Sequence, residues 1–495
     1  MEIQSSVCKL RVIRQSIDST QPYLVGSSAP SSSAATGVAV RLEQNVYIAT
    51  CFHVVVNARR IEAVFDDHFG SLPLRLRCVG CNPDLDIALL RVADGSISQT
   101  KLNRTVAPLL MGDSDALVHG EEVSLFGFPL GIRSMTQGIT TGRLGEPMRR
   151  LQISAPSSPG NSGGPVVAMQ HNKHRIVGIL TSSLVIAHAQ NFNLASPIYE
   201  ALLFMKRAIA SSIQPLFERE LSLNVRLSSA DRHFIESIPK STSGAVVAAI
   251  NTTDADRAGF EPGDVIRRVR VAQKENAWID IDAALNVTVP WCKFGPLHVK
   301  AALDRVERNS EGTSSRAVEF DIVRSKKRRS VSMNLSASND VFRIVYPLFE
   351  PLEFVVRAGV VVQMMSRNLA EADEEVSFDN AYMLTSDFVF YSCIVITHVR
   401  PDSPFHILYR PNPDGFVYVT SVNERPVTCL AEYAKAWATE MKGSDMITLR
   451  TRDSQMFSAP VKTIKKYEAE TKEVTSRAGR VSTVEHGAGG RLGQV

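Results

Sequence analysis

A glycine-rich turn around one serine constrains this chain of 495 residues more than any other segment. The turn reads Pro-Gly-Asn-Ser-Gly-Gly-Pro over residues 159–165, and an apolar Val-Val-Ala run follows at 166–168. Because glycine adopts positive φ and admits close backbone approach, such a turn can direct two N–H groups at one point beside a serine hydroxyl. That geometry holds an oxyanion next to a nucleophile. A Gly/Ser-rich surface turn is the alternative interpretation.

A serine hydroxyl is a weak nucleophile unless a base takes its proton and an acid orients that base. Of the eleven histidines, His53 lies at the end of a strand-like apolar run over residues 48–56. The alternative is a structural histidine whose ring nitrogens are hydrogen-bonded inside such a strand. Asp86 enters a second apolar run, where a buried carboxylate needs a partner such as an imidazole N–H. Asp84 is the rival acid, although it is better placed to cap the turn after Pro83.

These segments resemble the motifs of a known family. The serine turn is similar to the G-[DN]-S-G-G-P motif of trypsin-like serine proteases. Residues 50–55 resemble the T-x-x-H-V-V segment of the HtrA/Deg branch, and residues 84–92 resemble its D-x-D-[IL]-A-[VL]-L-[KR]-[VI] segment. The order His53, Asp86, Ser162 is that of the chymotrypsin-type fold. The resemblance implies that Ser162 attacks a scissile carbonyl, His53 transfers the proton and Asp86 orients the imidazole.

The same resemblance implies the groups that surround this triad. The N–H groups of Gly160 and Ser162 would form the oxyanion hole. The primary specificity pocket would be lined by Ser157, Asn193, Leu194 and Ala195. Because no acidic residue occurs there, a small or medium apolar side chain is expected just before the scissile bond. No metal and no other cofactor is expected.

Composition narrows the class of protein and its surroundings. Hydrophobic residues make up 44% and charged residues 21%, which is ordinary for a globular protein. The net charge of +4 is too small to argue for a nucleic-acid or anionic-membrane partner, so no nucleic-acid partner is expected. The seven cysteines are sparse and odd in number, which favours a reducing compartment. The pair Cys78 and Cys81 has metal-type spacing but no second pair. We expect neither a secretory signal nor a transmembrane segment, and therefore an intracellular protein, cytoplasmic or nuclear.

Residues 1–212 read as many short strands separated by turns, which is typical of a β-barrel or sandwich. Together with the motifs, this predicts a mainly β, chymotrypsin-like double Greek-key barrel with the site between the barrels. The Ser/Ala-rich residues 27–37 are expected to form a mobile loop. Residues 196–211 are expected to form an amphipathic helix with a serine cap and a proline at its first position.

Residues 213–337 resemble an HtrA-type PDZ domain, an α+β fold. A strand, a short helix, a Pro-Gly-Asp turn and another strand follow one another over residues 244–266, for which an ordinary β-α-β fragment is the alternative. The resemblance places peptide binding at Leu223, Asn224 and Val225. The family has a glycine before this strand and this chain has none. The basic residues 326–329 are interpreted either as a solvated hairpin turn or as a nuclear localisation signal.

Residues 338–465 resemble a second, diverged PDZ-like domain, with a helix at 430–441 and a final strand at 446–451. The polar, glycine-rich residues 466–495 are expected to be a disordered tail.

The whole order of domains resembles the HtrA/DegP family, and looks closest to the plant-type Deg proteases without a secretory signal. The resemblance implies an ATP-independent endopeptidase that cleaves unfolded or damaged proteins. Its PDZ domains would bind peptide C-termini or internal segments and govern access, and the chain would form a homo-oligomer built from trimers. The alternatives are a non-proteolytic holdase or scaffold on the same fold, and a processing protease with one dedicated substrate.

Overall fold

The computed structural model describes most of the chain in two compact units. One unit comprises Met1–Gln15 and Pro30–Asn339, and the other comprises Ser16–Ala29 and Asp340–Val495. The described residues are 2–22, 29–66, 68–93, 95, 97–144, 150–183, 193–219, 221–222, 225–229, 244–250, 258–271, 278–282, 286–289, 292–293, 296–299, 302–303, 317–337, 343–372, 394–406 and 416–471.

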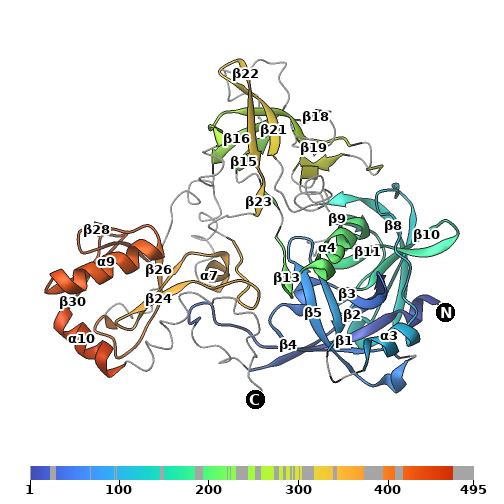
Figure 1. The fold of residues 1–495 in the computed structure, drawn as a ribbon, viewed down its shortest axis with the longest axis horizontal. Helices are drawn as coiled ribbons and strands as arrows, with labels where there is room; N and C mark the ends of the chain where they lie inside the picture. The colour runs from blue at the N-terminus through green and yellow to red at the C-terminus, as the bar shows by residue number, and fades with distance from the viewer. Residues whose placement is uncertain are drawn as a thin grey trace. The chain divides into compact units, whose positions relative to one another are not determined.

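Twelve strands of the first unit close into two six-stranded barrels, drawn in blue to green in Figure 1. The first barrel contains β1 (Val7–Arg14), β2 (Ser31–Leu42), β3 (Asn45–Thr50), β4 (Ala58–Val64), β5 (Leu74–Asn82) and β6 (Ile87–Val92). The second contains β7 (Glu122–Gly127), β8 (Ser134–Leu144), β9 (Arg150–Ile153), β10 (Pro165–Gln170), β11 (Lys173–Ser183) and β12 (Asn193–Pro197). The short strand β13 (Leu216–Phe217) adds to β5 in parallel.

Both barrels have the same strand order. In the first, β1 pairs with β2, β2 with β3, β3 with β6, β6 with β5, β5 with β4 and β4 with β1. The second repeats this order as β7-β8-β9-β12-β11-β10 and closes from β10 to β7. All these pairs are antiparallel, and the return from the third strand to the sixth is a Greek-key connection. The fold is therefore the mainly β, double-barrel fold expected for a chymotrypsin-like domain.

Short helices connect and cover the barrels. They are α1 (Glu2–Ser5), α2 (Phe52–Val55), α3 (Gln99–Thr105) and α4 (Ile198–Ala210), with the 3₁₀ turns η1 (Phe69–Ser71) and η2 (Pro129–Gly131). Helix α4 buries one face that includes Ala201, Phe204 and Ala208, which recur at helical spacing. A Cβ on Gly80 of β5 would lie 2.6 Å from the Ala208 Cβ, so the glycine permits the close packing of α4 on this strand.

Three local expectations for this domain are wrong. Residues 31–37 are not a loop, because they form the first half of β2 and pair with β1 from Ser31↔Arg14 to Gly37↔Cys8. The strand expected to end at His53 ends at Thr50, and His53 lies on the single helical turn α2. Helix α4 begins at Ile198, because Ser196 belongs to β12 and donates its hydroxyl to the Leu85 carbonyl rather than capping a helix.

Beyond the two barrels, the described residues of the first unit form an open sheet and two short ribbons. The sheet has the order β15 (Val225–Ser229), β16 (Ala245–Ile250), β17 (Val265–Val271), β21 (Ala317–Arg324) and β22 (Lys327–Asn334), with β18 (Ile279–Asp280) on β17. The ribbons pair β14 (Leu221–Ser222) with β23 (Ser336–Ala337), and β19 (Asn286–Val287) with β20 (Leu297–His298). The basic residues 326–329 lie exposed at the hairpin between β21 and β22, as the solvated-turn interpretation predicts.

The second unit is built on one antiparallel sheet, drawn in orange in Figure 1. Its strands are β24 (Phe354–Arg357), β25 (Val360–Met364), β26 (Ile394–Val399), β27 (Val417–Val422), β28 (Arg425–Pro426), β29 (Met446–Thr451) and β30 (Met456–Pro460). Its helices are α7 (Arg367–Ala372), α9 (Leu430–Gly443) and α10 (Val461–Glu470). The core centres on Trp437 and Tyr433 of α9, whose rings lie 5.9 Å apart.

The end of this unit differs from the expectation. Residues 446–451 are not the final strand, because β30 pairs with β29 and leads into α10. The prediction places the start of the disordered tail too early, at residue 466, because α10 continues to Glu470. Val461, Ile464 and Tyr467 recur at helical spacing and are buried, which explains why the helix persists. Residues 472–495 lie outside the described part of the chain.

Across the described residues, no helix combines the length and the apolar character needed to cross a membrane.

Candidate active site

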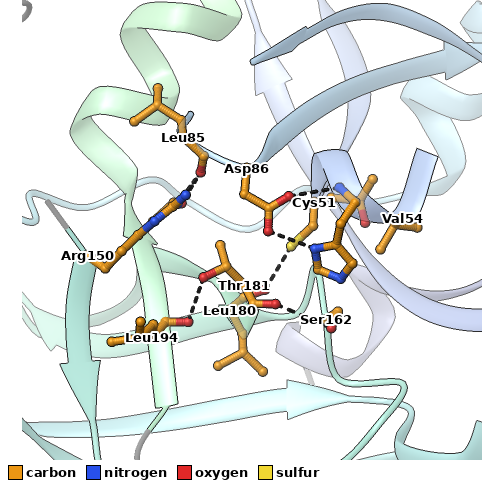
Figure 2. A network of polar contacts seen from close by, with 12 residues as sticks. Cys51, Val54, Leu85, Asp86, Arg150, Ser162, Leu180, Thr181 and Leu194 are labelled. Atoms are coloured by element: carbon orange, nitrogen blue, oxygen red, sulfur yellow. Dashed lines mark hydrogen bonds and ion pairs between the residues drawn. The ribbon is translucent and has the colours of Figure 1, made fainter. Parts of the chain in front are cut away.

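His53, on the helical turn α2, and Asp86, in the turn before β6, form a hydrogen-bonded pair. The Asp86 carboxylate accepts twice from His53: Oδ2 lies 2.7 Å from Nδ1, and Oδ1 lies 2.8 Å from the backbone N (Figure 2). The side chain of Asp86 is 16% exposed, whereas that of His53 is 44% exposed. The carboxylate is thus largely shielded, while one face of the imidazole is open to solvent. This pairing fixes the ring with Nε2 as its free nitrogen.

The backbone that carries Asp86 is held from several sides. Asp86 has φ of +51°, a left-handed conformation that needs support in a residue other than glycine. The Asn82 side chain accepts from the Leu85 N–H at 2.8 Å. Arg150, at the start of β9 in the other barrel, donates to the Asp84 carbonyl at 2.9 Å and also to the Leu85 carbonyl (Figure 2). One guanidinium therefore joins the acid's turn to the second barrel.

Ser162 lies in the glycine turn at the start of β10. Gly160 has φ of +103°, and a Cβ there would meet the Phe128 carbonyl oxygen at 2.4 Å. Gly163 has φ of +87°, and its Cβ would lie 2.2 Å from the Thr36 carbonyl oxygen. Both positions therefore require glycine for backbone conformation and for space.

Thr36 of β2 fastens this turn to the first barrel. Its N–H donates to the Ser162 carbonyl at 2.9 Å, and its hydroxyl donates to the Gly160 carbonyl at 2.7 Å. Thr36 is fully buried, and its Oγ1 also accepts from the Phe128 N–H at 3.0 Å. With the carbonyls of Gly160 and Ser162 bound on this side, their N–H groups make no hydrogen bond to any described protein acceptor.

The Ser162 hydroxyl makes its hydrogen bond to a backbone carbonyl in this structure and not to His53. It donates to the Thr181 carbonyl over 3.5 Å, and among the described residues no hydrogen bond joins it to His53 Nε2. Such bonds are often long or unformed without substrate and tighten when it binds.

Arg14, the last residue of β1, holds the helical turn that carries His53. Its guanidinium donates to the carbonyls of His53 at 3.0 Å and Val54 at 2.9 Å. These are end-of-helix carbonyls that lack partners within so short a helix. Burial lowers the pKa of Arg14. Arg14 therefore holds the backbone of the His53 turn, as Arg150 holds the backbone of the Asp86 turn.

Ser157 and Asn193, two of the predicted pocket residues, contact each other directly. Ser157 Oγ donates to Asn193 Oδ1 at 2.5 Å, and Asn193 Nδ2 donates to the Ala155 carbonyl at 2.6 Å. Leu194 and Ala195 follow Asn193 in β12, where the Leu194 carbonyl accepts from the Thr181 hydroxyl at 3.0 Å. The structure thus brings Ser157 and the 193–195 strand together, joined by a polar contact between Ser157 and Asn193.

Comparison with known proteins identifies one domain of this chain. Residues 35–179 match the family described as trypsin-like peptidase domain. Curated relatives named "Serine protease HtrA-like", from Staphylococcus aureus strains MRSA252 and NCTC 8325, are 25% identical over 240 residues. This chain contains a trypsin-like peptidase domain and is similar to HtrA-like serine proteases.

The match covers only part of these relatives. The aligned segment is 45% of the present chain and 30% of each Staphylococcus aureus protein. Among solved structures, an HtrA-type protease AlgW with a decapeptide is 20% identical and has a TM-score of 0.49, covering 68% of this chain and 97% of that one. A serine endoprotease from Yersinia pestis is 20% identical and has a TM-score of 0.43, covering 68% of this chain and 96% of that one.

Several groups that contact this site carry no signal in the sequence. Thr36, Arg14 and Arg150 each reach the site from a distant segment, and their residue types carry no motif. Cys51 lies just before the His53 turn and is fully buried, and no sequence pattern distinguishes it from the other six cysteines. Of the predicted peptide-binding residues, Leu223 and Asn224 lie outside the described residues, and Val225 begins β15.

Proposed function

We propose that this HtrA-like chain is a serine endopeptidase with Ser162 as nucleophile, His53 as general base and Asp86 as the orienting acid. One observation carries the proposal: the Asp86 carboxylate accepts from both Nδ1 and the backbone N–H of His53, beside the glycine turn of Ser162. Two hydrogen bonds to one residue set both the position of the imidazole and its tautomer. Nε2 is then the nitrogen left to accept a proton.

The reaction is acyl transfer through a tetrahedral intermediate. As Ser162 Oγ attacks the scissile carbonyl, Nε2 of His53 takes the hydroxyl proton and later returns it to the leaving amine. Asp86 stabilises the imidazolium that forms between these steps. Water, activated by the same imidazole, then hydrolyses the acyl-enzyme.

The N–H groups of Gly160 and Ser162 would stabilise the oxyanion of that intermediate. Support comes from their carbonyls, which face Thr36 and leave both N–H groups without a described protein acceptor. Removing one donor of this kind typically slows kcat by about 10²- to 10³-fold.

The substrate class follows from the same resemblance. Unfolded or damaged polypeptides are the proposed substrates, with a small or medium apolar residue before the scissile bond. The hydrogen bond between Ser157 and Asn193 engages both polar groups of this pair, which favours an apolar ligand over a charged one. PDZ-like modules at 213–337 and 338–465 would control access, and trimer-based assembly is proposed from the family alone. The six described cysteines are all free thiols, which supports a reducing, intracellular location.

A fluorophosphonate probe tests the triad directly, because it labels a serine only when a base activates it. Wild type should be labelled, whereas Ser162→Ala and His53→Ala should not. Ser158→Ala is the matched control, since this exposed serine lies in the same loop. Labelling that survives in Ser162→Ala would contradict the proposal.

A non-proteolytic holdase is the second candidate. The observation that favours it is the Ser162 hydroxyl, which in this structure donates to Thr181 instead of His53. Suppression of aggregation by wild type and Ser162→Ala alike, with no turnover of casein by either, would support the holdase. Casein cleavage by wild type alone would support the endopeptidase.

A further inference from the structure

Cys51 is a potential metal ligand that the proposed reaction does not use. Its side chain is fully buried, and its thiol donates to the Leu180 carbonyl at 2.9 Å. Figure 2 shows its sulfur beside the Asp86 carboxylate. Burial and the neighbouring Asp86 charge raise the pKa of the thiol.

Three different metal-ligand atoms meet at this point. Cys51 Sγ, one ring nitrogen of His53 and one Asp86 oxygen all lie within 4.8 Å of one another. Tetrahedral Zn²⁺ sites hold thiolate sulfur at about 2.3 Å and nitrogen or oxygen at about 2.0 Å, so bound ligand atoms lie roughly 3–4 Å apart. Small movements of these side chains would reach that geometry, and water could supply a fourth ligand. His53 is the most exposed of the three residues, with 44% of its side chain open to solvent.

We propose that Cys51, His53 and Asp86 form an inhibitory binding site for a thiophilic divalent cation such as Zn²⁺. The cation would replace the hydrogen bond between His53 and Asp86 and bind both side chains together with the Cys51 thiolate. Its binding rests only on the geometry of these residues, whereas inhibition also rests on the proposed serine-protease function.

The proton balance explains why binding would inhibit. Cys51 loses its thiol proton to solvent when its sulfur binds the metal. His53 stays neutral, but coordination through Nδ1 moves the ring proton to Nε2. In that tautomer Nε2 is a donor, and it cannot accept the proton of Ser162. Dissociation of the cation restores the bond between Nδ1 and Asp86, so inhibition is reversible.

Arg150 limits the affinity of such a site. Its positive charge acts on Cys51 from nearby and would repel a bound cation. The cation must also displace the thiol proton and the thiol's hydrogen bond to Leu180. The site is therefore suited to reversible inhibition by free cation rather than to permanent retention of a structural metal.

Binding is tested with Co²⁺, whose thiolate complex absorbs through sulfur-to-metal charge transfer. The protein is the full chain carrying Ser162→Ala, which keeps all three ligands and makes the result independent of activity. We expect a charge-transfer band that Zn²⁺ removes by competition and that adding Cys51→Ala abolishes. Cys8→Ala is the matched control, because Cys8 is also fully buried and donates to a backbone carbonyl.

A second control tests Cys78 and Cys81, whose neighbouring thiols are an alternative source of a Co²⁺ band. Burial and the Cys78 thiol raise the pKa of Cys81. A band lost in Cys78→Ala but kept in Cys51→Ala would overturn the proposal, and so would the absence of any band. In the enzyme with Ser162 intact, Zn²⁺ should reduce fluorophosphonate labelling at least about tenfold, and less than twofold in Cys51→Ala. Equal inhibition of both proteins would also overturn it. An unlabelled protein that still shows the Cys51-dependent band would refute the proposed protease and support the metal site.

Discussion

At the scale of single residues, Asp86 offers the sharpest test of the proposed mechanism. In Asp86→Asn the amide would donate to His53 Nδ1 instead of accepting from it, so the ring would adopt the wrong tautomer. We expect kcat to fall by about 10⁴-fold, as for such a change in a related triad, with the fold unchanged. Peptide hydrolysis and thermal unfolding measure the two effects.

Asp84→Asn is the matched control for this prediction. The neighbouring aspartate contributes its backbone carbonyl to Arg150, and that carbonyl survives the substitution. We therefore expect kcat to stay within about tenfold of wild type. An equal loss in both variants would show that the turn, and not the Asp86 carboxylate, controls the rate.

The residues proposed for the chemistry were found from the sequence because each one lies in a distinctive local pattern. Thr36 and Arg150 were not, because their role depends on contacts between distant segments. Thr36 reaches Gly160 across 124 positions, and Arg150 reaches Leu85 across 65. A threonine in a Ser/Ala-rich stretch and an arginine before a strand carry no signal of those contacts. The roles of His53, Asp86 and Ser162 themselves stay predictions.

At the scale of elements, strand β9 positions the acid through Arg150. Its guanidinium donates to two successive carbonyls of the turn that carries Asp86. In Arg150→Met the Asp84 carbonyl loses the arginine and the Leu85 carbonyl keeps its hydrogen bond from Ser196, so the turn with its positive φ at Asp86 loses part of its support. A displacement of about 1 Å in a catalytic group can cost roughly 10²-fold in rate. We expect kcat to fall about 10- to 100-fold with KM changed less than twofold.

Arg150→Lys should recover part of this loss, since an ammonium can still bind one of the carbonyls. Arg175→Met is the matched control in the same barrel, because Arg175 also donates to a backbone carbonyl, that of Met111 at 3.0 Å. Its kcat should match wild type. A rise in KM with unchanged kcat in Arg150→Met would assign the arginine to substrate binding instead of positioning.

Helix α9 ends in a carboxylate network that predicts acid-dependent stability. Glu440 accepts from the Ser444 hydroxyl at 2.5 Å, from Arg425 at 2.6 Å and from Asn423 at 2.6 Å, which together lower its pKa from the ordinary 4.5 to about 2. Because the folded-state pKa is depressed, this stabilisation is complete above the unfolded pKa and is lost as pH falls through the folded value.

Glu440→Gln should therefore lower the melting temperature of the second unit at pH 7 and change it little near pH 2. Thermal unfolding followed by circular dichroism at several pH values measures the difference. Glu470→Gln serves as control, because Glu470 is exposed and its ion pair with Lys466 spans 3.9 Å. A difference between wild type and Glu440→Gln that grows as pH falls would contradict this linkage.

Element boundaries show where local patterns mislead. Small, polar residues predicted a loop at 27–37. Residues 31–37 instead pair with β1, because their backbone groups supply the hydrogen bonds that join β2 to β1 in the barrel. His53 continues an apolar run, but the chain leaves the strand after Thr50 and turns once as α2, where Asp86 accepts from the His53 backbone N–H. In both cases tertiary pairing overrides local preference.

At the scale of the whole molecule, the double barrel could be predicted because short strands and three motifs point to one topology. The duplicated strand order then follows from the pairings themselves. The predicted bounds at 212 and 337, and the PDZ character of the two later regions, stay predictions. One feature had no sequence signal: residues 16–29, between β1 and β2, belong to the same compact unit as residues 340–495.

This division predicts two separable unfolding transitions. In the second unit, the Gln363 side chain is 2% exposed and donates to the Ser19 carbonyl and to the Thr397 hydroxyl, each at 2.8 Å. Gln363→Ala removes both bonds and leaves a cavity, at a cost of about 1–3 kcal/mol. Gln170→Ala is the counterpart in the first unit, where that amide both donates to the Asp113 carbonyl and accepts from its N–H at 2.8 Å. Calorimetry of the full chain should show each substitution lowering a different transition. If both lower the same one, the two units unfold as a single body.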